Sequence, residues 1–332
     1  MPLAGNADIG RTWQNVRFRP KADIKPVTRA PQSAMCTARR YSQQELLAGL
    51  REGDCVASIV KEVPMARRQD FRRIGLLVPS SSSVQERDFC RALPEDITLH
   101  VARMRLSNVE SESTLRIVQE IEIESQKLAD VDVDVIVFPA TAPSARNGIG
   151  YDQELIKRIR AASGKPATTA STALLEALRV LSAKRIALGA PWSAPVNQTV
   201  ATFLEANGVK VLAQETLGLI RNLEIGLLDP QTALDVGRRV DRPGVDAVIL
   251  ACGNWGTFSV IDQLERELGK PVLTTNQVSL WHALKMLNGK PLGGPGVLLR
   301  HHIPGSTSAQ PTEIPANSEL PRTTMLSATN TS

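Results

Sequence analysis

One cysteine of this chain stands where a predicted strand ends. Cys252 follows the apolar run Ala247–Leu250 and precedes Gly253-Asn254, a small turn whose backbone N–H groups can reach a ligand. A thiol in such a place can transfer a proton or add to a substrate, depending on its pKa. A lone cysteine is often only a small buried hydrophobic residue. The position favours chemistry, because open α/β sheets bind ligands beyond the carboxyl ends of their strands.

Two loops rich in small residues offer groups that bind anions. The longer loop runs from Pro139 to Gly150, and its backbone N–H groups and the hydroxyls of Thr141 and Ser144 suit a carboxylate or enolate oxygen. Its length exceeds that of an ordinary strand-to-helix connection, which favours a functional role over a plain link. The shorter loop, Pro79–Ser83, precedes a predicted helix, so its serines could bind a small anion or only cap that helix.

The remaining reactive side chains form no recognisable site. The 4 cysteines lack a CxxC spacing and the 4 histidines lack a ligand pattern, which argues against a zinc site or a disulfide framework. His282 could approach the site or lie on a helix surface, and Trp192 and Trp281 could wall an apolar pocket or fill the core. Neither the dinucleotide fingerprint nor the P-loop motif occurs. We therefore expect no metal and no cofactor.

Strand-like and helix-like segments alternate along the chain and must position these residues. The apolar runs of strand length are Ile74–Val78, Leu99–Val101, Val133–Phe138, Arg185–Leu188, Val209–Leu212, Ala247–Leu250 and Pro271–Leu273. The amphipathic stretches are Ser113–Leu128, Asp152–Ala162, Ala173–Leu181, Val196–Ala206, Gln231–Val240, Phe258–Leu268 and Ser279–Leu287. Such alternation predicts an α/β fold with parallel sheets flanked by helices.

The sequence also contains an internal duplication. The matched pairs are Ile74–Pro79 with Ile186–Pro191, Val133–Ala140 with Val245–Cys252, and Gly164–Pro166 with Gly269–Pro271. The first two pairs share one offset, since 186 − 74 and 245 − 133 both equal 112. We predict two pseudo-symmetric lobes with the active site in the cleft between them. Ala140 and Cys252 are equivalent, so one wall of the cleft should offer a thiol and the other a methyl group.

The predicted organisation has four parts. Residues 72–184, plus the end of the core, should form the first lobe, and residues 185–303 the second. Residues 1–71 read as a poorly ordered basic extension, and Met65 within it is a candidate natural start. Residues 1–73 hold 14 basic and 7 acidic residues, a balance of +7, which leaves 5 − 7 = −2 for the rest of the chain. Residues 304–332 read as a disordered tail rich in Ser, Thr, Pro and Asn.

The composition argues against several classes of partner. Aromatic residues make up 4% of the chain, too few for a nucleic-acid surface built on base stacking. No apolar run approaches the roughly 18 residues that span a bilayer, so we expect no membrane contact. The chain also lacks a short apolar leader, and we expect a cytoplasmic protein. A homo-oligomer is an expectation from base rates alone.

Several motifs resemble those of the aspartate/glutamate racemase superfamily, and within it the maleate isomerase and arylmalonate decarboxylase group. The resemblance covers about residues 72–300. It is carried by Ile74–Ser81, Gly150–Leu155, Pro166–Ala173, Leu217–Gly226, Ala251–Gly253 and Trp281–Leu284. It implies the same two-lobed α/β fold that the duplication predicts.

The resemblance also implies roles for individual residues. Racemases and isomerases of the superfamily generally place a cysteine on each side of the substrate. Cys252 matches the second cysteine, whereas the first falls on Ala140, which cannot donate, accept or attack. Arylmalonate decarboxylases look similar to this arrangement, because they have a small residue at the first position and the remaining cysteine protonates the enediolate left after CO₂ departs.

Other positions depart from the pattern of the group. The asparagine of the isomerases' first loop falls on Ser82, and the tyrosine after the fifth strand falls on Trp192, while Asn222 matches a substrate-binding asparagine. The decarboxylases' Thr-Ser pair is Thr141-Ala142 here, so one side-chain donor is lost. From the loops and the resemblance together, we expect the substrate to be bound by Pro79, Ser80, Ser82, Ala140, Thr141, Ala142, Trp192, Asn222 and Gly253.

From these observations we predict a cofactor-independent decarboxylase of an aryl- or alkenylmalonate, with Cys252 protonating the enediolate. One alternative is a cis–trans isomerase of a maleate-like diacid that uses Cys252 as the adding nucleophile. Another is a hydrolase of a small ester or lactone, for which the sequence offers no identified histidine partner. From a different class, the fold could bind a small carboxylate without turnover.

Overall fold

The computed structural model describes residues 71–289 and 294–301. All of them belong to one compact unit, Arg67–Ser332. Most of the predicted basic extension, the candidate start at Met65 and the predicted tail at 304–332 lie outside the described residues.

The first lobe is built on a parallel sheet of 4 strands in the order β2-β1-β3-β4. The strands are β1 (Arg72–Pro79), β2 (Ile97–Met104), β3 (Val135–Phe138) and β4 (Ala167–Thr169). The helices are α3 (Gln85–Ala92), α4 (Ser111–Arg116), η1 (Ile117–Glu120), α5 (Ile121–Asp130), α6 (Thr141–Ala145), α7 (Tyr151–Ser163) and α8 (Ala170–Val180). Central β3 is buried along its whole length, as its continuous apolar sequence requires.

The second lobe repeats this plan in the order β6-β5-β7-β8, again with parallel pairing. Its strands are β5 (Arg185–Trp192), β6 (Lys210–Leu219), β7 (Ala247–Leu250) and β8 (Val272–Thr274). Its helices are α9 (Ala194–Ala206), α10 (Asn222–Gly226), α11 (Pro230–Val240), η2 (Phe258–Val260), α12 (Ile261–Leu268), α13 (Thr275–Met286) and α14 (Gly296–His301).

The duplication read from the sequence is present in the strand register. Ile74 pairs with Val135 in the first sheet, and Ile186 pairs with Ala247 in the second, each residue 112 positions after its counterpart (186 − 74 and 247 − 135). The predicted fold class, two pseudo-symmetric parallel α/β lobes, is therefore confirmed.

The repeated Gly-Lys-Pro motif ends a helix in each lobe. Gly164 follows α7 with φ +68°, and Gly269 follows α12 with φ +65°. Glycine adopts this left-handed conformation without the steric cost of a Cβ, so both helices stop there. A short strand begins shortly afterwards, β4 in one lobe and β8 in the other.

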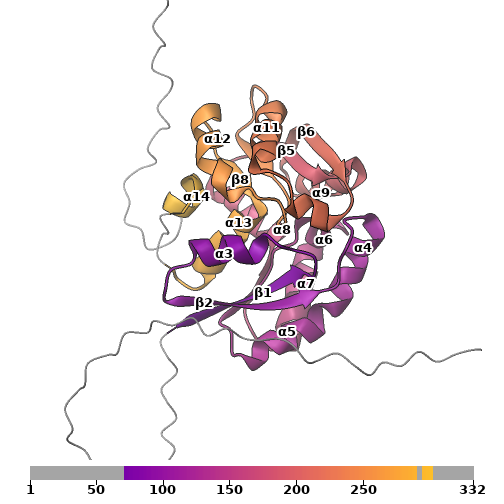
Figure 1. The fold of residues 1–332 in the computed structure, drawn as a ribbon, viewed down its shortest axis with the longest axis vertical. Coiled ribbons are helices and arrows are strands. Elements are labelled where there is room, and N and C mark those ends of the chain that lie inside the picture. Colours follow the sequence, from indigo (N-terminus) through magenta and orange to yellow (C-terminus); the bar gives the residue numbers. More distant parts are fainter. Residues whose placement is uncertain (1–70, 290–293, 302–332) are drawn as a thin grey trace, which may run out of the picture. The chain divides into compact units, whose positions relative to one another are not determined.

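Helices α8 and α13 join the two lobes. These equivalent helices pack on each other (Figure 1). Helix α13 also packs against β3, β4 and α3 of the first lobe. A side-chain cap stabilises the N-terminus of each of these helices. The Thr169 side chain accepts from the Thr172 N–H at the start of α8, and Thr274 forms a capping box with Gln277 at the start of α13. The N-terminus of α13 is thereby fixed beside the end of β7, where Cys252 lies.

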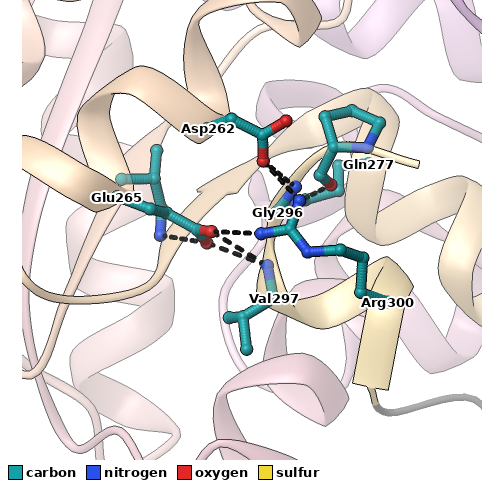
Figure 2. Close-up of polar contacts among 8 residues, drawn as sticks. Asp262, Glu265, Gln277, Gly296, Val297 and Arg300 are labelled. Atoms are coloured by element: carbon teal, nitrogen blue, oxygen red, sulfur yellow. Dashed lines mark hydrogen bonds and ion pairs between the residues drawn. The ribbon is translucent and has the colours of Figure 1, made fainter. Parts of the chain in front are cut away.

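The last described helix, α14, is fastened to α12 by two carboxylates (Figure 2). Glu265 accepts from the Val272 N–H at 3.2 Å and from the Val297 N–H at 2.9 Å. Asp262 accepts from the Gly296 N–H at 2.9 Å and from the Arg300 guanidinium at 2.5 Å. Glu265 thus links β8 to α14 and holds the end of the described chain against the second lobe.

Candidate active site

A pocket lies between the lobes at the carboxyl ends of the strands. Its lining comes from both halves of the chain: Pro79, Gln85, Leu106, Val109, Thr114, Pro139, Ala140, Thr141, Ala142, Pro143, Trp192, Asn222, Cys252, Gly253 and Asn254. The cavity measures about 30 Å³, which leaves room for water. The site is therefore narrow in this conformation.

Cys252 is held in a strained backbone conformation just beyond β7. Its φ is +150°, a region that residues with a side chain rarely adopt. Its N–H donates to the Thr275 Oγ1 at 2.9 Å, so the first residue of α13 fixes the cysteine. Strain of this kind persists only where the surroundings impose it, and it is concentrated at functional sites.

The thiol of Cys252 is buried, with 5% of the residue exposed. Burial raises its pKa to about 12, because a thiolate would be desolvated there, although hydrogen bonds from the backbone N–H groups of Asn254 and Trp255 act in the opposite direction. At neutral pH Cys252 is accordingly a protonated thiol with two amides beside its sulfur.

The first lobe supplies the opposite wall from the start of α6. Ala140 is the N-cap residue of this helix, which has no side-chain cap. The N–H groups of Thr141 and Ala142 therefore have no acceptor within the helix. The Thr141 hydroxyl lies 2.7 Å from the Thr275 Oγ1, the same atom that accepts from the Cys252 N–H. Thr275 thus contacts one residue of each wall, Thr141 and Cys252.

Of the six other residues predicted to bind the substrate, four line the pocket and two do not. The four that line it are Pro79, Trp192, Asn222 and Gly253. The Trp192 indole N–H donates to the Asn197 Oδ1 at 3.2 Å, so Trp192 presents an apolar face to the pocket. The Asn222 side chain donates to the Ser81 hydroxyl at 2.9 Å, which joins the lobes.

Ser80 and Ser82 lie outside the lining of the pocket. The Ser80 N–H donates to the Met104 carbonyl at 2.7 Å, and its hydroxyl accepts from the Leu106 N–H at 3.1 Å, so it secures the end of β2. Ser82 is buried and donates to the Asn254 Oδ1 at 3.3 Å. Their role as substrate ligands stays a prediction.

Asn254 is a residue of the site whose importance the sequence did not reveal. Its Oδ1 accepts from the backbone N–H groups of Ser83 at 2.8 Å and Val84 at 3.2 Å, and its Nδ2 donates to the Asn222 carbonyl at 2.6 Å. It therefore ties the loop before α3 to the second lobe. The sequence signal was only its place two residues after Cys252.

A two-stranded strap lies beside the pocket, which Val109 and Asn222 line, and it was not predicted. It consists of Ser107–Val109 from the first lobe and Ile220–Asn222 from the second. The Val109 N–H donates to the Ile220 carbonyl at 2.7 Å, and the Asn222 N–H donates to the Ser107 carbonyl at 2.9 Å. Asn108 and Arg221 form an antiparallel bridge between the two segments, which lie 113 positions apart in the sequence (221 − 108).

His282 does not line the pocket. It lies on α13, where its Nδ1 is 2.7 Å from the Thr168 Oγ1. Burial lowers its pKa to about 4, with a further contribution from Lys285. Among the described residues there is no cluster of three or more potential metal ligands, and no helix is long and apolar enough to cross a membrane.

Comparison with known proteins shows to which family this chain belongs. The family model for arylmalonate decarboxylase matches residues 74–295. A maleate isomerase of Pseudomonas putida is 32% identical over 241 residues, which cover 68% of this chain and 96% of that protein. An arylmalonate decarboxylase of Bordetella bronchiseptica is 28% identical and covers 67% of this chain and 93% of its own length.

A solved relative carries a covalent intermediate. The structure of a Nocardia farcinica maleate cis–trans isomerase with a covalently bound succinylcysteine has a TM-score of 0.67 and 27% identity, and the match covers 69% of this chain and 98% of that one. In that relative a cysteine thus carries a succinyl group as a covalent intermediate. This chain belongs to the arylmalonate decarboxylase family, within the aspartate/glutamate racemase superfamily.

Proposed function

We propose that this protein is a cofactor-independent decarboxylase of a malonate that bears an aryl or alkenyl group, and that Cys252 protonates the enediolate. Both kinds of relative, decarboxylase and isomerase, are enzymes named for chemistry on small carboxylates. The observation that carries the choice is the asymmetry of the pocket, in which Cys252 lines the second-lobe wall and Ala140 the first. One thiol suffices for protonation from one face, whereas proton exchange on two faces needs two such groups.

The groups around the pocket suit the charge that decarboxylation develops. When the bond to the departing carboxylate breaks, its electron pair passes into the remaining carboxylate and forms an enediolate. The N–H groups of Thr141 and Ala142 can donate to those oxygens, and so can the Thr141 hydroxyl when Thr275 donates to it. Such fixed donors stabilise developing negative charge more than mobile water does.

The carboxylate that leaves as CO₂ requires apolar surroundings instead of hydrogen-bond donors. One side of the pocket is apolar and is lined by Leu106, Val109 and Trp192. A carboxylate against such a surface loses hydration, whereas CO₂ is neutral and does not. Loss of CO₂ is thereby favoured on that side.

The protonation state of Cys252 fits the role of general acid. With its pKa raised to about 12 by burial, the thiol holds its proton at neutral pH and can deliver it to the α-carbon. The resulting thiolate is stabilised by the Asn254 and Trp255 N–H groups until it regains a proton from solvent. A nucleophile would instead need to be deprotonated before attack.

The test is turnover of phenylmalonate in D₂O. We expect one deuterium at the α-carbon, delivered to one face, and loss of turnover in Cys252→Ala. Racemic product, or full activity of Cys252→Ala, would contradict the proposal.

A maleate-type cis–trans isomerase is the second candidate, because one of the relatives matched over two thirds of this chain is a maleate isomerase. In that function Cys252 would act as the nucleophile. Turnover of maleate by the wild type with none of phenylmalonate, and a gain in Ala140→Cys, would favour it over decarboxylation.

A further inference from the structure

Gln85, on the first turn of α3, is a buried polar residue of the pocket that the proposed mechanism does not use. It is 1% exposed and lines the pocket. Its Nε2 donates to the Pro139 carbonyl at 2.6 Å. Its Oε1 is buried and has no hydrogen-bond partner among the described residues. Leaving such an acceptor unpaired is unfavourable, so the side chain points to a missing donor.

The orientation of the Gln85 amide follows from its partner. A carbonyl oxygen can only accept, so the atom facing Pro139 must be the nitrogen. The oxygen is therefore the free atom, and only a hydrogen-bond donor can satisfy it. A substrate carboxylate cannot, because it too is an acceptor.

The Gln85 amide also lies where the two walls of the pocket meet. It bonds to Pro139, which precedes Ala140, and it packs on Gly253, which follows Cys252. A Cβ at Gly253 would lie 2.3 Å from the Gln85 Nε2 and 2.9 Å from the Pro139 carbonyl. Pro139 and Gly253 are the chain neighbours of Ala140 and Cys252, so the Gln85 amide lies beside both residues that form the opposite walls of the pocket.

We propose that Gln85 is a specificity-determining residue that selects a malonate with a hydroxyl group on its α-carbon, the hydroxyl donating to the Gln85 Oε1. This inference rests on the proposed decarboxylation. The reaction breaks one C–C bond, releases CO₂, and places a proton from Cys252 on the carbon that received the electron pair. The product is an α-hydroxy carboxylate, and no further reactant is needed.

The experiment compares hydroxy(phenyl)malonate with methyl(phenyl)malonate, in which a methyl group replaces the hydroxyl at nearly equal size. In the wild type we expect kcat/KM to be about 10- to 100-fold higher for the hydroxy substrate, because the methyl analogue leaves Oε1 unpaired. In Gln85→Met, which keeps the length of the side chain but removes the acceptor, the ratio should fall to about one. The matched control is Gln119→Met on the exposed face of η1, which should keep the wild-type ratio.

The outcomes separate the two proposals. Equal kcat/KM for both substrates in the wild type, or an unchanged ratio in Gln85→Met, overturns the role of Gln85 while Cys252-dependent turnover upholds the decarboxylase. If neither malonate is turned over, the proposed decarboxylase function is wrong. Calorimetry then decides the role of Gln85 by comparing the binding of mandelate with that of 2-phenylpropionate, in which a methyl group replaces the hydroxyl. Tighter binding of mandelate that disappears in Gln85→Met supports it, and equal binding overturns it.

Discussion

At the scale of single residues, the candidate site depends on Thr275 as much as on the cysteine. One oxygen, the Thr275 Oγ1, accepts from the Cys252 N–H and contacts the Thr141 hydroxyl. It holds a strained backbone on one wall and orients a donor on the other. Thr275 does not line the pocket, so we regard it as a positioning residue.

Replacing Thr275 by valine tests this role. Thr275→Val keeps the shape but leaves the Cys252 N–H and the Thr141 hydroxyl without their partner, and we expect kcat to fall about tenfold or more with a smaller change in KM. The buried unpaired groups should also lower the free energy of unfolding by about 1–3 kcal/mol. Steady-state kinetics and urea denaturation measure both effects. Thr275→Ser should restore kcat, and Thr202→Val on an exposed surface is the matched control; failure of serine to restore kcat would argue for a packing role alone.

Much of the pocket could be predicted from residue types, but the buried side chains that hold its walls in place could not. Ala140, Thr141 and Cys252 follow strands that the duplication aligns, so their common pocket follows from topology. Gln85 and Asn254 carry no motif. Their importance arises from contacts 54 and 171 residues away in the sequence, which no local pattern records.

At the scale of elements, strands with an apolar run were predictable, even the 3-residue β8 (Val272–Thr274), whereas β4 was not. β4, Ala167–Thr169, has 3 residues and two of them are threonines, so it lacks the apolar run by which β1 and β7 were recognised. The predicted helix Ser113–Leu128 is instead α4, η1 and α5, joined without a break in the chain. Its amphipathic period persists across the tighter turn, which is why the sequence reads as one helix.

We expect the strap to move when a substrate enters the pocket. The cavity of about 30 Å³ is small for a substituted malonate, and Val109 and Asn222 of the strap line it. The Asn108–Arg221 bridge is antiparallel and lies between its two hydrogen bonds, a pairing with Cα atoms about 4.5 Å apart. That separation suits a disulfide.

We therefore expect the double variant Asn108→Cys/Arg221→Cys to lose turnover when oxidised and regain it after reduction. The single variants, treated in the same way, should stay active. Kinetics before and after dithiothreitol provide the measurement. Full activity of the oxidised double variant, with the disulfide verified by mass spectrometry, would show that the substrate enters by another route.

At the scale of the whole molecule, the contact between α8 and α13 connects the two lobes within one compact unit. His282 and Lys285 of α13 reach Thr168 and Glu176 of the first lobe. Glu176 has its pKa lowered to about 2 by hydrogen bonds from Arg179 and Lys285, against the effect of burial. The interface is thus polar at its edge and includes a neutral histidine.

The histidine makes stability depend on pH in a definite direction. Burial lowers the pKa of His282 to about 4, below the value of about 6.5 in an unfolded chain. Between these values the unfolded state binds one proton more than the folded state, so this contribution to stability is present above pH ~6.5 and is lost as the pH falls to about 4. The loss amounts to about 2–4 kcal/mol, since each pH unit corresponds to about 1.4 kcal/mol.

Comparison with His282→Gln isolates this contribution from the carboxylates that also titrate in acid. Glutamine can still hydrogen-bond Thr168 but does not titrate, so the variant should be somewhat less stable than the wild type at pH 7 and should lose less stability between pH 6.5 and 4. Urea denaturation across that range gives the two curves. Parallel curves would mean that His282 has the same pKa in the folded and the unfolded protein, and would contradict the lowering by burial.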